Sequence, residues 1–283
     1  MKMKQKKYTT APLPFMGQKR RFLTEVKKVL DKCPAHATYV DLFGGSGLLS
    51  HTVKSYYPEA SVIYNDYDNY RERLLNVEKT NVLIKDIRAI LTDVPKDKKV
   101  PENEKKRILK RVFEEQSIVG YVDYITLSSS ILFSMKYVLS YDELKAQTMY
   151  NCVRQSEYNT DGYLDGLIIE SKDYKELFEQ YKNVPNVVFL VDPPYLSTET
   201  GTYKSYWKLK DYLDVLTVLE GTNYLYFTSN KSQIVELCDW IETRTYKGNP
   251  FDGSTTVSMN NAVNYNSSYT DIMLYKCWDS STT

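Results

Sequence analysis

Histidine and cysteine, the residue types that build most metal sites, are scarce in this chain. The 283 residues include only two histidines, and the four cysteines are widely scattered without a CxxC pair. This composition argues against a zinc site, an imidazole-based catalytic triad and a disulfide framework. His51 lies inside an apolar helical pattern, where a histidine is more often structural than functional. The residues concerned are His36, His51, Cys33, Cys152, Cys238 and Cys277.

Long apolar runs are also missing. The chain has no apolar span of about 20 residues, the length that crosses a bilayer, and nothing in it resembles a secretory signal. We therefore expect a soluble, cytoplasmic protein with no membrane partner.

The chain lacks an excess of either charge. It has 37 Lys and Arg against 36 Asp and Glu, so its composition is not that of a basic nucleic-acid-binding protein. The distribution is uneven, because residues 1–30 hold nine basic residues and one acid, Glu25. A basic end suits phosphate contacts, although residues 1–7 alone are by default a solvated tail. The 26 tyrosines fit a surface that meets bases, and they fit AT-rich coding equally well.

The order of apolar patterns predicts a parallel, doubly wound α/β sheet. A helix, a strand, a glycine-rich turn, a helix, a strand and a helix follow one another near the start, and strands and helices resume later. The predicted strands are residues 38–42, 61–65, 167–170, 187–191, 224–228 and 269–277. The predicted helices are residues 19–30, 48–56, 69–79, 209–219 and 232–241. Residues 252–268, rich in Asn, Ser, Thr and Gly, predict a loop or an irregular hairpin.

The pattern breaks in the middle of the chain. Residues 96–111 are highly charged, residues 113–139 look helical, and residues 151–166 are polar and loop-like. Because no parallel-sheet signature occurs there, we interpret 91–166 as an inserted, mostly helical subdomain. The sheet domain then comprises residues 1–90 and 167–283.

The most informative motif follows the apolar run at 187–191. Asp192, Pro193, Pro194 and Tyr195 leave the predicted strand in this order. The prolines stiffen the backbone and remove two donors, so the loop offers a carboxylate, a carbonyl acceptor and a stacking face. That set suits a planar ring with an exocyclic amino group. A proline-stiffened turn with a capping Asp is the alternative for these four residues alone.

A second motif joins the first strand to the next helix. Asp41 ends the strand, and Gly44, Gly45, Ser46 and Gly47 form a tight turn that lets a ligand approach the backbone at a helix N-terminus. The spacing is not GxGxxG, which disfavours NAD.

Two further candidates flank this turn. Asp66 follows the second strand, where an acid commonly holds ribose hydroxyls; a helix cap is the alternative. Gly17 and Lys19 open the first helix and could hold a carboxylate, although a surface lysine at a helix start explains them equally well.

Taken in order, these motifs resemble the Dam-type DNA adenine-N6 methyltransferases. The segments that carry the resemblance are PFMGQK (14–19), DLFGGSG (41–47), YNDYDN (64–69), DPPY (192–195), YFTSN (226–230) and DIMLY (271–275). The resemblance covers nearly the whole chain outside the inserted region. It implies a Rossmann-like, S-adenosylmethionine (SAM)-dependent methyltransferase domain, with the inserted helical subdomain as the DNA-recognition part.

The resemblance also assigns residues. It implies that Phe15 and Lys19 contact the methionine part of SAM, and that Asp66 binds its ribose. Phe15 stands where the family often has tryptophan, which keeps an aromatic ring. The remaining cofactor-binding matches are Gly17, Asp41, Phe43, Gly44, Gly45, Ser46, Gly47 and Asp192. The catalytic matches are Asp192, Pro193, Pro194 and Tyr195.

Double-stranded DNA is the partner that this family implies. The N6 atom of adenine is buried in the duplex, so the base must be flipped out, and Tyr195 is expected to stack on it. The Asp192 carboxylate and the Pro193 carbonyl would accept the N6 hydrogens, and no metal is needed. The inserted region supplies candidate DNA contacts, although a solvated helix face explains most of them equally well: Lys105, Lys106, Lys110, Arg111 and Arg154.

Other functions remain open at this level. Cytosine N4 or RNA could replace adenine N6 as the acceptor, because the chemistry is similar. A catalytically silent nucleic-acid-binding relative is the alternative from another class, although the intact motifs argue against it. The sequence does not reveal the target site, the oligomeric state or a restriction or phage context.

Overall fold

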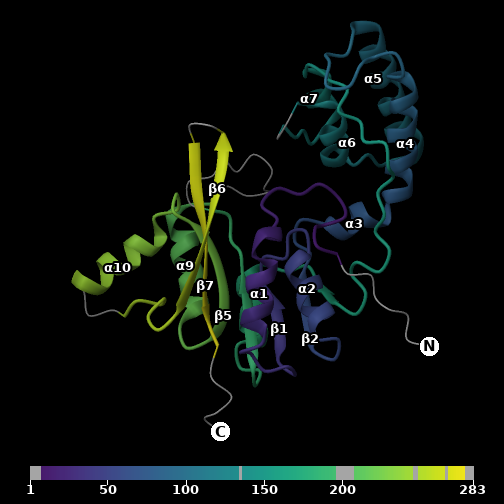
Figure 1. Ribbon diagram of the computed structural model, residues 1–283. Coiled ribbons are helices and arrows are strands. Elements are labelled where there is room, and N and C mark those ends of the chain that lie inside the picture. Colours follow the sequence, from purple (N-terminus) through teal and green to yellow (C-terminus); the bar gives the residue numbers. More distant parts are fainter. Residues whose placement is uncertain (1–7, 134–135, 196–206, 245–247, 265–266, 278–283) are drawn as a thin grey trace. The chain divides into compact units, whose positions relative to one another are not determined.

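The computed structural model describes residues 8–133, 136–195, 207–244, 248–264 and 267–277 (Figure 1). The chain forms two compact units. The first comprises 1–10, 17–69 and 162–283, and the second comprises 11–16 and 70–161. The second unit thus starts earlier than residue 91, the predicted start of the insertion, and includes a short N-terminal segment. Residues 1–7, the predicted solvated tail, lie outside the described residues.

The first unit is built on a seven-stranded sheet of order β3-β2-β1-β4-β5-β7-β6. The first five strands in this order are parallel, and β7 and β6 run antiparallel to their neighbours. This confirms the predicted Rossmann-like α/β fold. The strands are β1 (Thr38–Asp41), β2 (Ser61–Asn65), β3 (Ile168–Glu170), β4 (Val187–Val191), β5 (Asn223–Ser229), β6 (Thr255–Asn264) and β7 (Ser267–Lys276).

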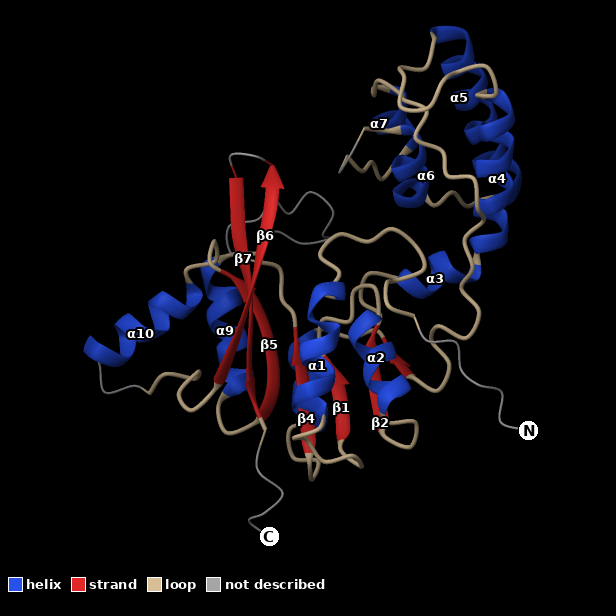
Figure 2. Ribbon diagram, viewed as in Figure 1, coloured by secondary structure: helices blue, strands red, loops and turns tan. Residues whose placement is uncertain are grey.

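Both faces are buried at the centre of this sheet, which explains why β4 is a continuous apolar run. Val188 and Leu190 pack into the core beneath α1 and α2. Val187, Phe189 and Val191 point to the opposite face, toward α8, α9 and α10. Figure 2 shows α1, α2, α9 and α10 beside the strands. The bounds of the five helices are α1 (Leu23–Leu30), α2 (Leu48–Tyr56), α8 (Tyr174–Tyr181), α9 (Leu209–Leu219) and α10 (Ile234–Arg244).

Several predicted bounds differ from those observed. The predicted helix at 19–30 begins with a 3-10 turn, Arg20–Phe22, before α1. The predicted helix at 69–79 is two helices that meet at Asn76, α3 and α4. The polar segment 252–268 contains the long strand β6, so its hairpin alternative is the correct one. Val257 and Met259 pack on the core at period two, a signal that the polar composition obscured.

One disulfide contradicts the expectation from cysteine spacing. Cys33, after α1, is bonded to Cys277, after β7, with the two Cα atoms 5.7 Å apart and a sequence separation of 244. Spacing along the chain carries no information on such a long-range pair, so the argument against disulfides is wrong here. Cys152 and Cys238 are free thiols. None of the helices in the described ranges has the length and hydropathy that crossing a membrane requires.

The second unit is helical, as the inserted region was predicted to be. It contains α3 (Tyr70–Leu75), α4 (Val77–Ile90), α5 (Glu102–Val119), α6 (Tyr124–Ile131) and α7 (Tyr141–Lys145).

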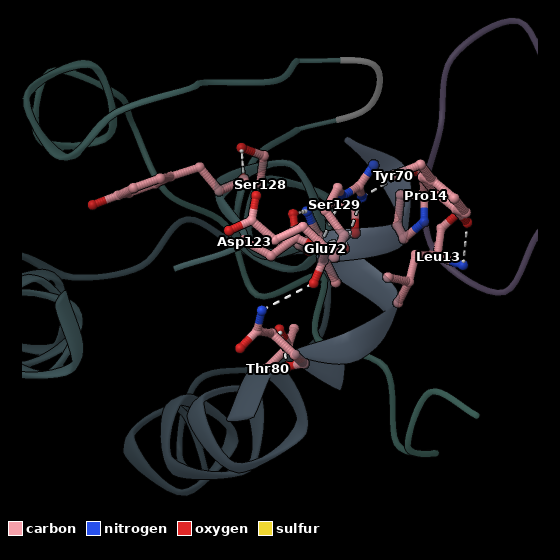
Figure 3. A network of polar contacts seen from close by, with 12 residues as sticks. Leu13, Pro14, Tyr70, Glu72, Thr80, Asp123, Ser128 and Ser129 are labelled. Atoms are coloured by element: carbon pink, nitrogen blue, oxygen red, sulfur yellow. Dashed lines mark hydrogen bonds and ion pairs between the residues drawn. The ribbon is translucent and has the colours of Figure 1, made fainter. Parts of the chain in front are cut away.

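A buried polar network ties residues 11–16 into this unit (Figure 3). The Nε atom of Arg73 lies 3.0 Å from Asp123 Oδ2, and its Nη2 atom donates to the Pro14 carbonyl over 2.8 Å. The backbone N–H of Leu13 donates to the Tyr70 hydroxyl over 3.0 Å. Because a buried charge needs a partner, this network fixes the N-terminal segment on α3 and α6.

Candidate active site

Three carboxylates lie at one edge of the sheet. β1 ends at Asp41, β2 is followed by Asp66, and β4 is followed by Asp192. β1 pairs in parallel with both β2 and β4, with Asp41 opposite Tyr64 and Leu190. The carboxyl ends of parallel strands meet at the same edge, and the chain reverses its winding direction beside β1. This is the point at which open α/β sheets bind ligands.

The turn between β1 and α2 packs tightly against β2. Gly47 closes the turn by donating to the Gly44 carbonyl over 2.7 Å, and its φ of 71° is in the left-handed region. A Cβ atom on Gly44 would lie 2.4 Å from the Tyr64 ring and 2.6 Å from the Asn65 carbonyl. The Tyr64 hydroxyl in turn bonds the Gly45 carbonyl (2.8 Å) and Asp66 Oδ1 (3.0 Å). The turn and Asp66 are therefore held in one hydrogen-bonded frame.

The helix that follows this turn is anchored by His51. Its Nδ1 lies 2.8 Å from the Tyr163 carbonyl, and its Nε2 accepts from the Tyr8 backbone over 3.1 Å. The Tyr163 hydroxyl donates to the Ser46 carbonyl over 2.9 Å. Burial lowers the pKa of His51, which keeps the ring neutral. These contacts confirm its structural role.

Asp41 is a buried carboxylate with one oxygen held in place. Its Oδ2 accepts from the Ser50 hydroxyl over 2.7 Å, while Oδ1 has no hydrogen-bond partner of good geometry within the described ranges. Burial raises the pKa of Asp41 to about 7, the Ser50 hydroxyl lowers it, the charge of Asp192 raises it, and the backbone N–H groups of Phe43 and Ser50 lower it. Such a group is poised to pair with a cationic or donor ligand.

Asp192 is paired with Lys19. The Lys19 Nζ lies 2.6 Å from Asp192 Oδ2, donates to the Gly17 carbonyl over 2.8 Å, and lies 5.2 Å from the centroid of the Tyr195 ring. The other oxygen, Oδ1, is buried and accepts no hydrogen bond from the described part of the chain. Burial raises the pKa of Asp192, Lys19 opposes this, and Asp271 adds to it. Lys19 thus fixes one carboxylate oxygen and leaves the other available to a donor.

The remaining sequence-predicted residues fall into different environments. Phe15 belongs to the second unit, where its ring meets Tyr70 edge-on at 5.6 Å, whereas Gly17 and Lys19 belong to the first. Pro193 and Pro194 are buried, and Phe43 is half-buried.

The five candidate DNA-contacting residues divide into two groups. Lys105 donates to the Gln147 carbonyl (2.8 Å), and Arg111 pairs with two acids, Asp86 and Glu115. Arg154 lies over the Tyr158 ring at 4.0 Å. These three side chains are engaged within the second unit. Lys106 and Lys110 are exposed on α5, and Lys110 lies 3.8 Å from Glu114.

Sequence reasoning missed an aromatic cluster beside the turn. Phe43 contacts Tyr174 and Trp207, with ring centroids 4.9 and 5.7 Å away. Tyr174 begins α8 four residues after β3 ends at Glu170, so it lies beyond the carboxyl end of a parallel strand, as Asp66 does. That repeated position after a strand is the signal that could have identified it. Among the described residues, no group of three or more His, Cys, Asp or Glu side chains could hold a metal ion.

Comparison with known proteins agrees with this geometry. A family model described as D12 class N6 adenine-specific DNA methyltransferase matches residues 15–224. The chain belongs to this family. A relative from Haemophilus influenzae, named "Putative methyltransferase", is 38% identical over 96% of this chain and 93% of its own length. Within the family assignment, Asp192 to Tyr195 occupy the strand-end loop of a methyltransferase domain.

Proposed function

We propose that this D12-class methyltransferase transfers a methyl group from SAM to the N6 atom of an adenine in DNA. The observation that carries the proposal is the state of Asp192. One of its oxygens is fixed by Lys19, and the other is buried and lacks a described partner in a loop stiffened by two prolines. An unsatisfied buried acceptor costs about 1–3 kcal/mol, and an amino group that donates to it would recover that energy.

The residues at the sheet edge fit SAM. SAM supplies an electrophilic methyl group on a sulfonium when it is bound, and the molecule carries positive charge. Asp41 is buried and its Oδ1 has no hydrogen-bond partner of good geometry within the described ranges, so its ionised form offers an acceptor for a cation. Asp66, held by Tyr64 at the end of β2, is placed to accept from ribose hydroxyls. Gly45 and Gly47 adopt the positive φ angles of the turn and add no side chain at these two positions.

The protein's contribution to the transfer is positioning and electrostatics. Asp192 Oδ1 and the Pro193 carbonyl accept hydrogen bonds from the two N6 hydrogens. This favours a tetrahedral nitrogen, whose lone pair is no longer delocalised into the ring. The N–C bond forms as the C–S bond breaks, and the nitrogen then loses one proton, first to Asp192 and then to solvent. Correct positioning of this kind contributes up to about 7–11 kcal/mol to lowering the barrier.

Access to N6 requires the adenine to leave the duplex. Base flipping costs a few kcal/mol, and Tyr195, whose ring is half-buried beside Lys19, is suited to stack on the flipped base. The second unit is proposed to contact the duplex and to select the target sequence, with Lys106 and Lys110 as its exposed phosphate contacts.

The test is a methylation assay on unmethylated duplex DNA with tritiated SAM, followed by mass spectrometry of the nucleosides. We expect N6-methyldeoxyadenosine from the wild type and none from Asp192→Ala, while the thermal unfolding midpoint shows that the variant still folds. Asp252→Ala, which removes an exposed carboxylate far along the chain from the motif, is the matched control. N4-methyldeoxycytidine as the product would refute adenine as the acceptor. Methylation by Asp192→Ala at the wild-type rate would refute the role of Asp192.

A further inference from the structure

A cationic rim lies along the carboxyl edge of the sheet, outside the residues assigned above. We propose that Arg21, Lys231 and Tyr269 form a nucleic-acid-binding surface that holds the backbone of the DNA strand next to the active site. This inference rests on the proposed function, because it concerns how the first unit itself binds the DNA substrate.

The rim is built where the β6–β7 hairpin extends beyond the rest of the sheet (Figure 2). β7 pairs with β5 as far as Asp271, which lies opposite Ser229 at the end of β5. At the preceding residue of β7, the Thr270 carbonyl accepts from the backbone N–H of Asn230 over 2.9 Å. The Thr270 N–H donates to Asn230 Oδ1, also over 2.9 Å. The hairpin is thereby fixed to the loop that follows β5, and Lys231 is the next residue in that loop.

Both cations of the rim are positioned against this hairpin. The Arg21 Nη1 donates to the Asn260 carbonyl on β6 over 3.2 Å, and the Lys231 Nζ lies 4.9 Å from the centroid of the Tyr269 ring on β7. Both side chains belong to exposed residues, whereas Tyr269 is half-buried. Two segments of the first unit that are far apart in sequence thus bring positive charge to the same hairpin.

Electrostatic coupling connects the rim to the active site. The charges of Lys19 and Arg21 both lower the pKa of Tyr269, although burial and Asp271 raise it overall. Lys19 is also the partner of Asp192, and Asp271 raises the pKa of Asp192 as well. Tyr269 therefore lies within electrostatic range of the same lysine that holds the catalytic carboxylate. Asp271 is the acid whose charge acts on Tyr269.

The chemistry of the rim suits a nucleic-acid backbone. A guanidinium has five N–H donors in a fork that matches phosphate, and a single bond to the Asn260 carbonyl uses one of them. Arg21 makes no ion pair within the described part of the chain. By contrast, other surface cations of this unit do: Lys28, Lys175, Lys182 and Lys210 each pair with an acid. The Tyr269 ring beside Lys231 adds a face for a base or sugar.

The test measures equilibrium binding of labelled duplex DNA over a series of salt concentrations. For Arg21→Gln combined with Lys231→Gln, we expect weaker binding at low salt and a plot of log K against log salt that is less steep by about 1.8, the effect of losing two phosphate contacts on duplex DNA. Tyr269→Leu is expected to weaken binding with little change in that slope. The control is Lys27→Gln combined with Lys28→Gln, which removes two exposed charges from α1 and should leave the slope unchanged.

The outcomes separate this inference from the proposed function. SAM affinity and the thermal unfolding midpoint are measured on every variant, and both should match the wild type. A wild type that methylates DNA, together with an unchanged salt slope for the Arg21 and Lys231 variant, would overturn the rim and leave the methyltransferase proposal standing. A wild type that binds no DNA would overturn both. A changed slope that the control variant shares would also reject the rim, because the effect would then come from general charge.

Discussion

The Asp41→Asn substitution should change how the free energy of unfolding of the first unit depends on pH. Folded Asp41 keeps its proton up to about pH 7, whereas an unfolded carboxyl loses it near 3.8. Between these values unfolding releases a proton, so the free energy of unfolding falls as pH rises, and the loss is complete above about pH 7. The pKa shift of about three units corresponds to about 4 kcal/mol in the free energy of unfolding. The wild type loses this amount between pH 4 and pH 8, whereas Asp41→Asn does not.

The side chain is 1% exposed, so solvent screening does not reduce this value. Asparagine also retains an oxygen that can accept from Ser50, so the 2.7 Å hydrogen bond survives the change. The variant should therefore be similar to the wild type at pH 4 and more stable than it at pH 8. At pH 8, where Asp41 of the wild type is ionised, the variant should bind SAM more weakly, because a neutral amide attracts a cation less than a carboxylate does.

The assay is urea unfolding without SAM, followed by tryptophan fluorescence at several values between pH 4 and pH 9. All three tryptophans lie in 162–283, so the signal follows the first unit. Asp252→Asn, at an exposed position, is the control and should behave as the wild type does. If the wild type and Asp41→Asn lost stability in parallel over the whole range, the raised pKa of Asp41 and the argument built on it would be wrong.

Three further changes test other contacts of the site. Gly44→Ala should destabilise the protein by about 1–3 kcal/mol and weaken SAM binding, because the added methyl group meets a ring and a carbonyl at under 3 Å; calorimetry would check both, and an unperturbed variant would contradict the packing of the turn. Lys19→Met should raise the pKa of Asp192 further, so the acidic limb of the pH profile of kcat moves to higher pH. Lys19→Arg should restore the wild-type profile. A profile that does not move in Lys19→Met would exclude a role of Lys19 in positioning Asp192. Lys106→Glu combined with Lys110→Glu should weaken DNA binding and flatten its salt dependence, and an equal salt slope would remove α5 from the interface.

Much of the fold and the site could be predicted from local patterns. The apolar run at 187–191, the glycine turn at 44–47 and the acid at position 66 each depend on a few neighbouring residues. Because parallel strands end at one edge, this pattern puts Asp41, Asp66 and Asp192 at the same edge of the sheet. That their strands are neighbours is decided by the order of the strands in the sheet. The helical nature of the inserted region follows from the same kind of pattern.

Other features depended on residues that are distant in sequence. The pairing of Lys19 with Asp192, the Cys33–Cys277 disulfide and the cationic rim each join segments separated by more than 150 residues. The engagement of Lys105 and Arg111 with neighbours in the second unit likewise depends on how its helices pack. Periodicity identifies which face of an element is buried, but it does not specify which side chain lies opposite. That is decided only when the elements pack, because the partners of a buried charge are chosen by distance in space.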